Sequence, residues 1–113
     1  MIRRFVAVLL AVAAPAALAA GCGGTGTSKP VATHEVLLPK SYRFEPSAVA
    51  IKAGTSVTWT NKDNFTHTVE VEGRPDHKLS PGESVTIRFA TPGTYHYECT
   101  LHSHDMHGEV FVT

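Results

Sequence analysis

The chain has 113 residues, with 10 acidic side chains, 10 basic side chains and 7 histidines. This length permits one domain and excludes a multidomain enzyme. The balanced charge and the lack of lysine or arginine clusters argue against a nucleic-acid-binding surface, so we expect no nucleic-acid partner.

Residues 1–21 have the pattern of an export signal peptide. Arg3 and Arg4 precede an apolar run over residues 5–20, and small residues follow it. The run is shorter than the roughly 18–20 residues needed to span a bilayer and contains a proline, which disfavours a membrane-spanning helix. The sequence therefore predicts that the rest of the chain is exported.

The stretch Ala-Ala-Gly-Cys that ends at Cys22 resembles a bacterial lipobox, in which the cysteine is lipidated and becomes the mature N-terminus. Lipoboxes favour Leu where Ala19 stands, so cleavage after Ala19, which gives a soluble secreted or periplasmic protein, is the alternative. Residues 22–33 are rich in Gly, Thr and Ser, a composition typical of a flexible tether. We predict that lipidated Cys22 and this tether hold the domain at the outer face of the cytoplasmic membrane.

The residue pattern of 34–113 predicts a series of short strands. Apolar residues alternate along runs that end at turn residues, and no run has a sustained helical period. The runs lie at residues 49–51, 57–59, 67–71, 85–89, 95–99 and 110–112. Seven or eight strands in this length predict an all-β fold, a small antiparallel Greek-key β-sandwich. A core of this size benefits from a disulfide or a metal. A disulfide is not expected, because lipidation of Cys22 leaves Cys99 as the only thiol.

Residues 99–107 carry the candidate chemistry. They contain Cys99, three histidines and Met106 at the end of an inward-facing strand. A thiolate, two imidazoles and a weak thioether are the ligands of a trigonal copper site with a long axial bond. The loop can supply the thiolate, one imidazole and the thioether. His67 is the candidate for the second imidazole, because it shares a face with two inward valines and is costly to bury without a partner.

Six short motifs follow one another between Phe44 and Thr113: Val-Thr-Trp-Thr-Asn-Lys-Asp (57–63), His-Thr-Val (67–69), Pro-Gly-Glu (81–83), Pro-Gly-Thr-Tyr (92–95), Cys-x-x-His (99–102) and Met-His-Gly (106–108). Together they resemble the motifs of the plastocyanin/amicyanin-like cupredoxins, the type 1 blue copper proteins. The resemblance implies a cupredoxin domain over residues 34–113 with an eight-stranded Greek-key sandwich. It implies one type 1 copper ion, with ligands His67, Cys99, His102 and Met106.

The ligand loop differs from the family in its spacing. Three residues separate His102 from Met106, whereas amicyanin-like members have two there and plastocyanins four. His104 is therefore an alternative ligand that competes with His102 or with Met106. Thr68 stands where an asparagine often follows the first histidine, and Leu101 where a proline often precedes the loop histidine.

The expected function is electron transfer by a copper ion that cycles between Cu(I) and Cu(II). No nucleophile–base pair or open coordination position is visible, so we do not expect an enzyme. The resemblance implies that electrons leave through the exposed edge of His102, with Leu101 and Phe65 as apolar neighbours. We expect a monomer that meets a membrane-associated respiratory redox partner while its lipid anchor confines it near the membrane.

Three alternatives remain open at this point. The first is extracytoplasmic copper binding and delivery or protection, for which His96, His104 and His107 would catch a second, weaker ion. The second is zinc as the metal, although structural zinc sites use four strong ligands and this set offers three and a thioether. The third is a metal-free adhesive sandwich, which requires the ligand spacing to be accidental.

Overall fold

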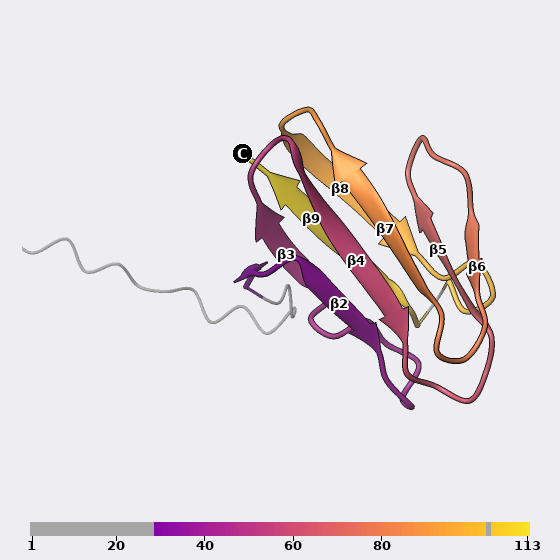
Figure 1. Cartoon of the computed structure of the whole chain (residues 1–113). Helices are drawn as coiled ribbons and strands as arrows, with labels where there is room; N and C mark the ends of the chain where they lie inside the picture. The colour runs from indigo at the N-terminus through magenta and orange to yellow at the C-terminus, as the bar shows by residue number, and fades with distance from the viewer. Residues whose placement is uncertain (1–28, 104) are drawn as a thin grey trace, which may run out of the picture.

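A computed structural model describes residues 29–103 and 105–113. These residues contain no helix, and hence none long and apolar enough to cross a membrane. The signal peptide at residues 1–21, Cys22, the first part of the tether and His104 lie outside the described residues. The described ranges form nine strands (Figure 1): β1 (Val31–Ala32), β2 (Glu35–Leu38), β3 (Ala48–Ile51), β4 (Thr55–Asn61), β5 (His67–Val71), β6 (His77–Leu79), β7 (Ser84–Phe89), β8 (Gly93–Glu98) and β9 (His107–Val112).

The strands form two sheets that face each other. The larger sheet has the order β1-β3-β9-β8-β5-β6 and the smaller one β2-β4-β7 (Figure 1). The prediction of an all-β sandwich is confirmed. The described residues have nine strands rather than seven or eight. The three strands that the predicted runs do not include, β1, β2 and β6, have only two to four residues, too few for a clear alternating pattern.

The predicted antiparallel pairing is found for only some of the strands. The pairs β1–β3, β2–β4 and β3–β9 are parallel, while β4–β7, β5–β6, β5–β8 and β8–β9 are antiparallel. The alternation of apolar residues identifies which face of a strand is buried, and that face is the same for either pairing direction. The direction instead follows from long connections that cross between the sheets.

Alternating side chains of both sheets fill the space between them. In β4, Val57, Trp59 and Asn61 face inward, while the residues between them are partly exposed. Fully burying one large apolar side chain stabilises the fold by about 1.5–3 kcal/mol. The largest wholly buried apolar side chains are Trp59, Tyr97, Phe89, Leu38 and Met106.

Strand register brings the predicted metal ligands to one end of the sandwich. The antiparallel pair β5–β8 aligns Glu70 with Glu98 and Val71 with Tyr97. His67, at the start of β5, therefore lies at the same end of the larger sheet as Cys99, the residue after β8. Tertiary pairing thus joins positions that are 32 residues apart in the chain.

The loop between β8 and β9 is closed by its own backbone hydrogen bonds. The amide of Cys99 donates to the carbonyl of Met106 at 3.0 Å, and the amide of Met106 donates to the carbonyl of His102 at 2.8 Å. The amide of His102 in turn donates to the carbonyl of Cys99 at 3.0 Å. These bonds give the three predicted ligands of the loop a defined backbone arrangement.

A tight contact joins β8, β9 and the segment before β3. The hydroxyl of Tyr97 donates to the carbonyl of Ser47 at 2.6 Å, and burial raises the pKa of Tyr97, which keeps this donor protonated. A Cβ atom at Gly108 would overlap both the Ser47 carbonyl and the Tyr97 ring. Only glycine therefore fits at Gly108 with the backbones at this separation.

Candidate metal centre

His67 is wholly buried, and its two ring nitrogens have different surroundings. Nε2 lies 2.8 Å from Oδ2 of Asp63, and Nδ1 lies 3.8 Å from Sγ of Cys99. An ionised carboxylate can only accept, so the ring hydrogen is on Nε2. The lone pair of Nδ1 is thereby directed to the side of the ring where the sulfur lies.

Asp63 is itself fixed in place. Its backbone amide donates to Oδ1 of Asn61 at 2.8 Å, and its own Oδ1 accepts from the amide of Asn64 at 2.7 Å. The hydrogen bond from His67 lowers the pKa of the Asp63 carboxyl below its ordinary value. The side chain of Asn61 donates to the carbonyls of Phe65 and Leu79 at 2.8 and 3.0 Å, which ties this loop to β6.

Cys99 is buried and carries the free thiol of the described residues. Its sulfur accepts the backbone N–H of Thr68 at 3.4 Å and lies 3.7 Å from the hydroxyl of Thr68. A hydrogen bond from the backbone N–H stabilises the thiolate, which is the form that binds a metal. The sulfur is thus held between the residue after His67 and the His67 ring itself.

His102 and Met106 lie near this pair. The half-buried ring of His102 has its centroid 5.6 Å from that of His67, and Met106 is wholly buried. Within residues 29–103 and 105–113, no three His, Cys, Asp or Glu side chains form a closed group that could hold a metal ion. The structure therefore brings His67 and Cys99 into contact and His102 beside them, while His104 lies outside the described residues.

An aromatic cover lies over the two imidazoles. The ring of Tyr42 meets His102 edge-on at 4.8 Å and His67 at 6.0 Å between centroids, and it stacks on Phe65 at 6.3 Å. Tyr42 has a positive φ of 50°, which non-glycine residues seldom adopt. Phe65 and Leu101, which the sequence predicts as exposed apolar neighbours of the site, are 59% and 57% exposed.

No pattern in the sequence marks Asp63 or Tyr42 as part of this site. Asp63 lies four residues before His67 in a stretch that reads only as a turn. Its signal is its spacing from a histidine expected to be buried, because a ligating imidazole usually donates its other N–H to a carboxylate or carbonyl. Tyr42 has no periodic pattern around it that marks its role.

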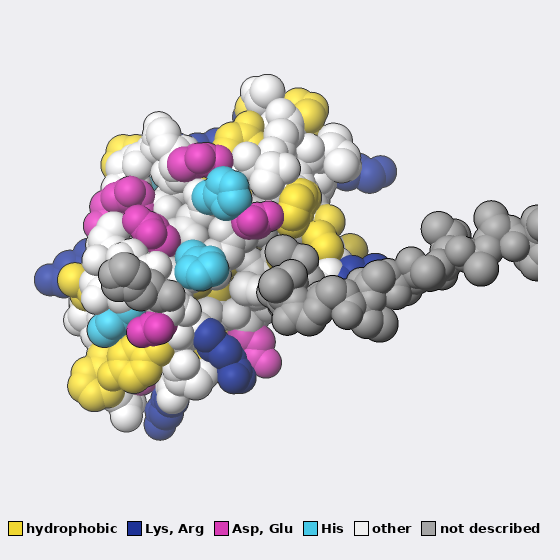
Figure 2. Space-filling model, turned by 180° about the vertical axis from the view of Figure 1, so that it is seen from behind, with side chains coloured by type: hydrophobic (Ala, Val, Ile, Leu, Met, Phe, Trp, Pro, Cys, Tyr) yellow, Lys and Arg dark blue, Asp and Glu magenta, His cyan; other side chains and the backbone are white. Residues whose placement is uncertain are grey.

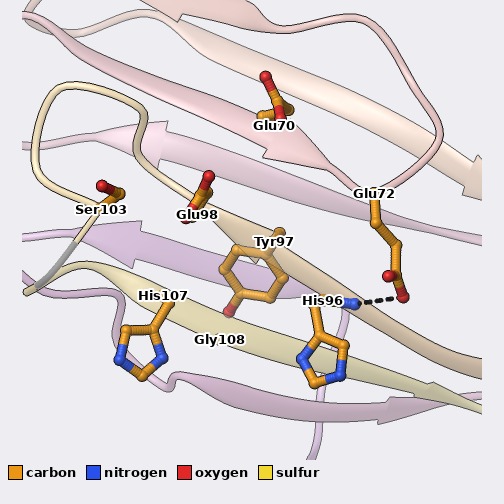
Figure 3. Close-up of a pocket in the computed structure, with 8 residues that line it drawn as sticks. All are labelled: Glu70, Glu72, His96, Tyr97, Glu98, Ser103, His107 and Gly108. Atoms are coloured by element: carbon orange, nitrogen blue, oxygen red, sulfur yellow. Dashed lines mark hydrogen bonds between the residues drawn. The ribbon is translucent and has the colours of Figure 1, made fainter.

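The outer face of the larger sheet carries a separate group of histidine and acidic side chains (Figure 2). A hollow of about 390 Å³ there is lined by Glu70, Glu72, His96, Glu98 and His107 among others (Figure 3). The amide of His96 donates to Glu72 at 3.0 Å, and the His96 ring lies 3.4 Å from Glu109. His96 and His107 are exposed, so this group is separate from buried His67 and Cys99.

Comparison with known proteins identifies the family. The family model described as "Cupredoxin-like domain" matches residues 4–112. The chain belongs to the cupredoxin family. It is 37% identical to amicyanin-alpha of Methylorubrum extorquens over 115 residues, which is 96% of this chain and 95% of that protein. It is 40% identical to plastocyanin of Scenedesmus fuscus over 72 residues, 52% of this chain and 74% of the relative.

Solved structures give the same result. The "Novel Purple Cupredoxin from Nitrosopumilus maritimus" superimposes with a TM-score of 0.67 and 25% identity, covering 72% of this chain and all of that one. The predicted family, the plastocyanin/amicyanin-like cupredoxins, is thereby confirmed. So are copper as the cofactor and electron transfer as the function of this cupredoxin.

The residues around His67 and Cys99 fit a copper ion. A buried thiol, an imidazole with its lone pair directed to the sulfur side and a buried thioether are the soft and borderline donors that copper prefers. The pairing of Nε2 with Asp63 leaves Nδ1 as the nitrogen that can ligate. In this cupredoxin the second imidazole would come from the loop between β8 and β9.

Replacing Asp63 with alanine is expected to weaken both the fold and copper binding. The variant leaves Nε2 of His67 buried without an acceptor, which costs roughly 1–3 kcal/mol in the free energy of unfolding. Loss of such a partner also lowers metal affinity by roughly 10–100-fold. Denaturant titration of the metal-free protein and competition with a copper chelator measure the two effects. Asp63→Asn, which keeps an oxygen acceptor, is the control and should lose less of both.

The stabilisation by Asp63 has a predictable pH dependence in the metal-free protein. Because its pKa is lowered in the folded state, the carboxyl stabilises the fold above the pKa of the unfolded chain. This contribution is lost as the pH falls from about 4 through the lower pKa of the folded state. The difference in unfolding free energy between wild type and Asp63→Ala should therefore shrink below about pH 4. A constant difference down to pH 2 would contradict this account.

Proposed function

We propose that His67, Cys99, His102 and Met106 hold one type 1 copper ion, and that the protein transfers single electrons through it. The observation that carries this proposal is the buried contact of 3.8 Å between Nδ1 of His67 and Sγ of Cys99. Asp63 occupies the other nitrogen of His67, so this contact presents two free donor atoms to one point. When bound, copper supplies the one-electron chemistry of the Cu(I)/Cu(II) couple.

The side chains around the proposed ligands exclude water and hold the donor atoms in place. His67, Cys99 and Met106 are wholly buried, which excludes water from three of the four proposed ligands. The hydrogen bonds at Asp63 and Thr68 hold the imidazole and the sulfur in one arrangement. A site that does not rearrange when the charge of the metal changes transfers electrons with a low barrier, and its dry shell controls the potential.

Electrons would enter and leave at the end of the sandwich near His102. This residue is half-buried, and Phe65, Leu101 and Tyr42 expose apolar surface around it. Such a patch suits a transient contact with a redox partner protein, because apolar surface can be buried and released without forming or breaking ion pairs. The proposed role is that of a carrier and not of an enzyme.

Copper delivery or protection is the competing function. A protein that hands over its metal needs ligands that a partner or a chelator can reach. Three of the proposed ligands, His67, Cys99 and Met106, are wholly buried and therefore inaccessible. This burial favours electron transfer over delivery.

The visible spectrum and redox behaviour of the copper-loaded protein test the proposal. A thiolate bound to Cu(II) should give an intense visible absorption that disappears on reduction and returns on oxidation. Voltammetry should show a reversible one-electron couple with rapid transfer. Colourless copper-loaded protein would overturn the ligand assignment, and rapid metal release to a chelator without reversible transfer would favour delivery.

The proposed lipid anchor has its own test. Cys22→Ser should move the protein from the membrane fraction to the soluble fraction, because the lipidated residue is lost. Bacterial lipoproteins carry several acyl chains, and multiple chains hold a protein firmly on a bilayer, whereas one chain binds only marginally. Immunoblots of separated fractions, with Cys99→Ser as a matched control that should stay membrane-bound, measure the effect. Unchanged partitioning of Cys22→Ser would favour cleavage after Ala19.

A further inference from the structure

A chain of two hydroxyl groups links the buried sulfur of Cys99 to a carboxylate at the surface. The hydroxyl of Thr68 lies 3.7 Å from Sγ and 2.7 Å from the hydroxyl of Thr100. The hydroxyl of Thr100 lies 3.0 Å from Oδ2 of Asp76. Asp76 and Thr100 are exposed, whereas Thr68 and Cys99 are buried. The chain therefore connects the environment of the sulfur with solvent.

The two hydroxyl groups have too few hydrogen atoms to fill every contact along this hydrogen-bonded path. Sulfur to Thr68, Thr68 to Thr100 and Thr100 to Asp76 make three contacts, but the two hydroxyls supply one hydrogen each. The backbone amide of Thr100 donates to the Thr68 oxygen at 2.7 Å in either arrangement and does not alter this count. When a metal is bound, the sulfur is a thiolate and supplies no hydrogen. One contact must then lack a hydrogen.

The charge of Asp76 decides which contact that is. An ionised carboxylate is a strong acceptor that cannot donate, so it draws the hydrogen of Thr100 toward itself. The hydrogen of Thr68 must then occupy the short contact to Thr100. We infer that Asp76 is a positioning residue that turns the Thr68 hydroxyl away from the Cys99 sulfur. The sulfur keeps the backbone N–H of Thr68 at 3.4 Å as its hydrogen-bond donor from this residue.

This inference rests on the proposed copper site and assigns a control of its potential. Hydrogen bonding around the cysteine sulfur tunes the potential of a type 1 site. A donor at the sulfur withdraws negative charge from the thiolate, which disfavours Cu(II) and raises the potential. By directing the Thr68 hydrogen away from the sulfur, Asp76 keeps the potential lower than the same ligands would otherwise have.

Thr100→Val separates this effect from the simple negative charge of Asp76. The variant keeps the carboxylate and the backbone amide but removes the hydroxyl between Thr68 and Asp76. Because Thr100 is exposed, the substitution does not change the packing of the core. The Thr68 hydrogen is then free to point at the sulfur. We expect the potential to rise in voltammetry and the copper–sulfur stretching frequency to fall in resonance Raman spectra. Thr68→Val keeps the backbone N–H that donates to the sulfur and should not lower the potential, because the hydroxyl that it removes does not donate to the sulfur in wild type.

Double variants complete the test. Thr100→Val should have no effect when Thr68→Val is already present, since the responding hydroxyl is gone. Asp76→Asn should raise the potential more in the wild-type background than in Thr68→Val, and the difference measures the part that the hydroxyl chain transmits. An unchanged potential in Thr100→Val, or a lowered potential in Thr68→Val, would overturn the inference.

A measurement without copper distinguishes failure of this inference from failure of the proposed function. Neutron diffraction from deuterium-exchanged crystals of the metal-free protein should place the deuterium of Thr68 between the two threonine oxygens. A deuterium on the line to the sulfur would overturn the hydroxyl direction whatever the metal does. If the wild-type protein gives no thiolate-to-copper absorption while Thr68 points to Thr100, the ligand assignment fails and the orienting role of Asp76 stands.

Discussion

Cys99→Ser should abolish the intense visible absorption of the copper-loaded protein and most of the stabilisation that copper provides. A metal that binds only the native state stabilises it by about 2.7 kcal/mol at a free concentration 100-fold above its Kd. For a domain of this size that corresponds to a rise of roughly 10–20 °C in the unfolding temperature. A serine hydroxyl does not ionise at neutral pH and cannot replace the thiolate. Absorption spectra and thermal unfolding with and without copper measure both losses.

Cys22→Ser is the matched control for this experiment. It makes the same chemical change outside residues 29–103 and 105–113, so the colour and the copper-dependent rise should both remain. We therefore expect the Cys99 substitution to change the absorption but not membrane partitioning. The Cys22 substitution should change membrane partitioning but not the absorption. A Cys99→Ser protein that keeps a strong visible band would show that another donor gives rise to the absorption.

His102→Ala should bleach or shift the absorption, whereas His104→Ala should leave it almost unchanged. Removing a proposed ligand opens a coordination position, and we expect copper affinity to fall by at least about tenfold, the lower end of what loss of a mere supporting residue costs. The amide of Met106 bonds to the carbonyl of His102 in a turn that keeps these two residues close. That turn supports His102 and Met106 as ligands of one ion.

Met106→Leu completes the comparison of the loop positions. A long thioether bond contributes little affinity, so this variant should keep its copper and its colour. Loss of the weak axial donor should raise the reduction potential. If instead His104→Ala bleaches the protein and His102→Ala is mild, the extra residue of the loop has moved the ligand to His104. Met106, two residues further along, would then have little reach to the axial position.

The sequence predicts the parts of this molecule that depend on local pattern. Alternation identified the inward faces of the strands around Trp59 and Val69, and the cysteine-to-histidine spacing marked the ligand loop. Strand direction was not predictable, because parallel pairs such as β3–β9 are formed by distant segments with no shared turn. Tyr42 was not predicted for a related reason, because its loop meets His67 only in the folded chain. Asp63 is only four residues from His67, but a turn pattern does not show that its side chain folds back onto the buried ring.

Figure 1 shows β9 inside the larger sheet, where it pairs with β3 on one side and with β8 on the other. Every strand that it joins is synthesised earlier. Until His107–Val112 has emerged, the sheet is divided into two unpaired pieces, β1–β3 and β8–β5–β6, with open edges facing each other. A nascent chain therefore has no complete sandwich before its last strand has been made. Closure of the larger sheet is therefore a step that follows synthesis of the whole domain, and the signal peptide predicted at residues 1–21 implies that it also follows export.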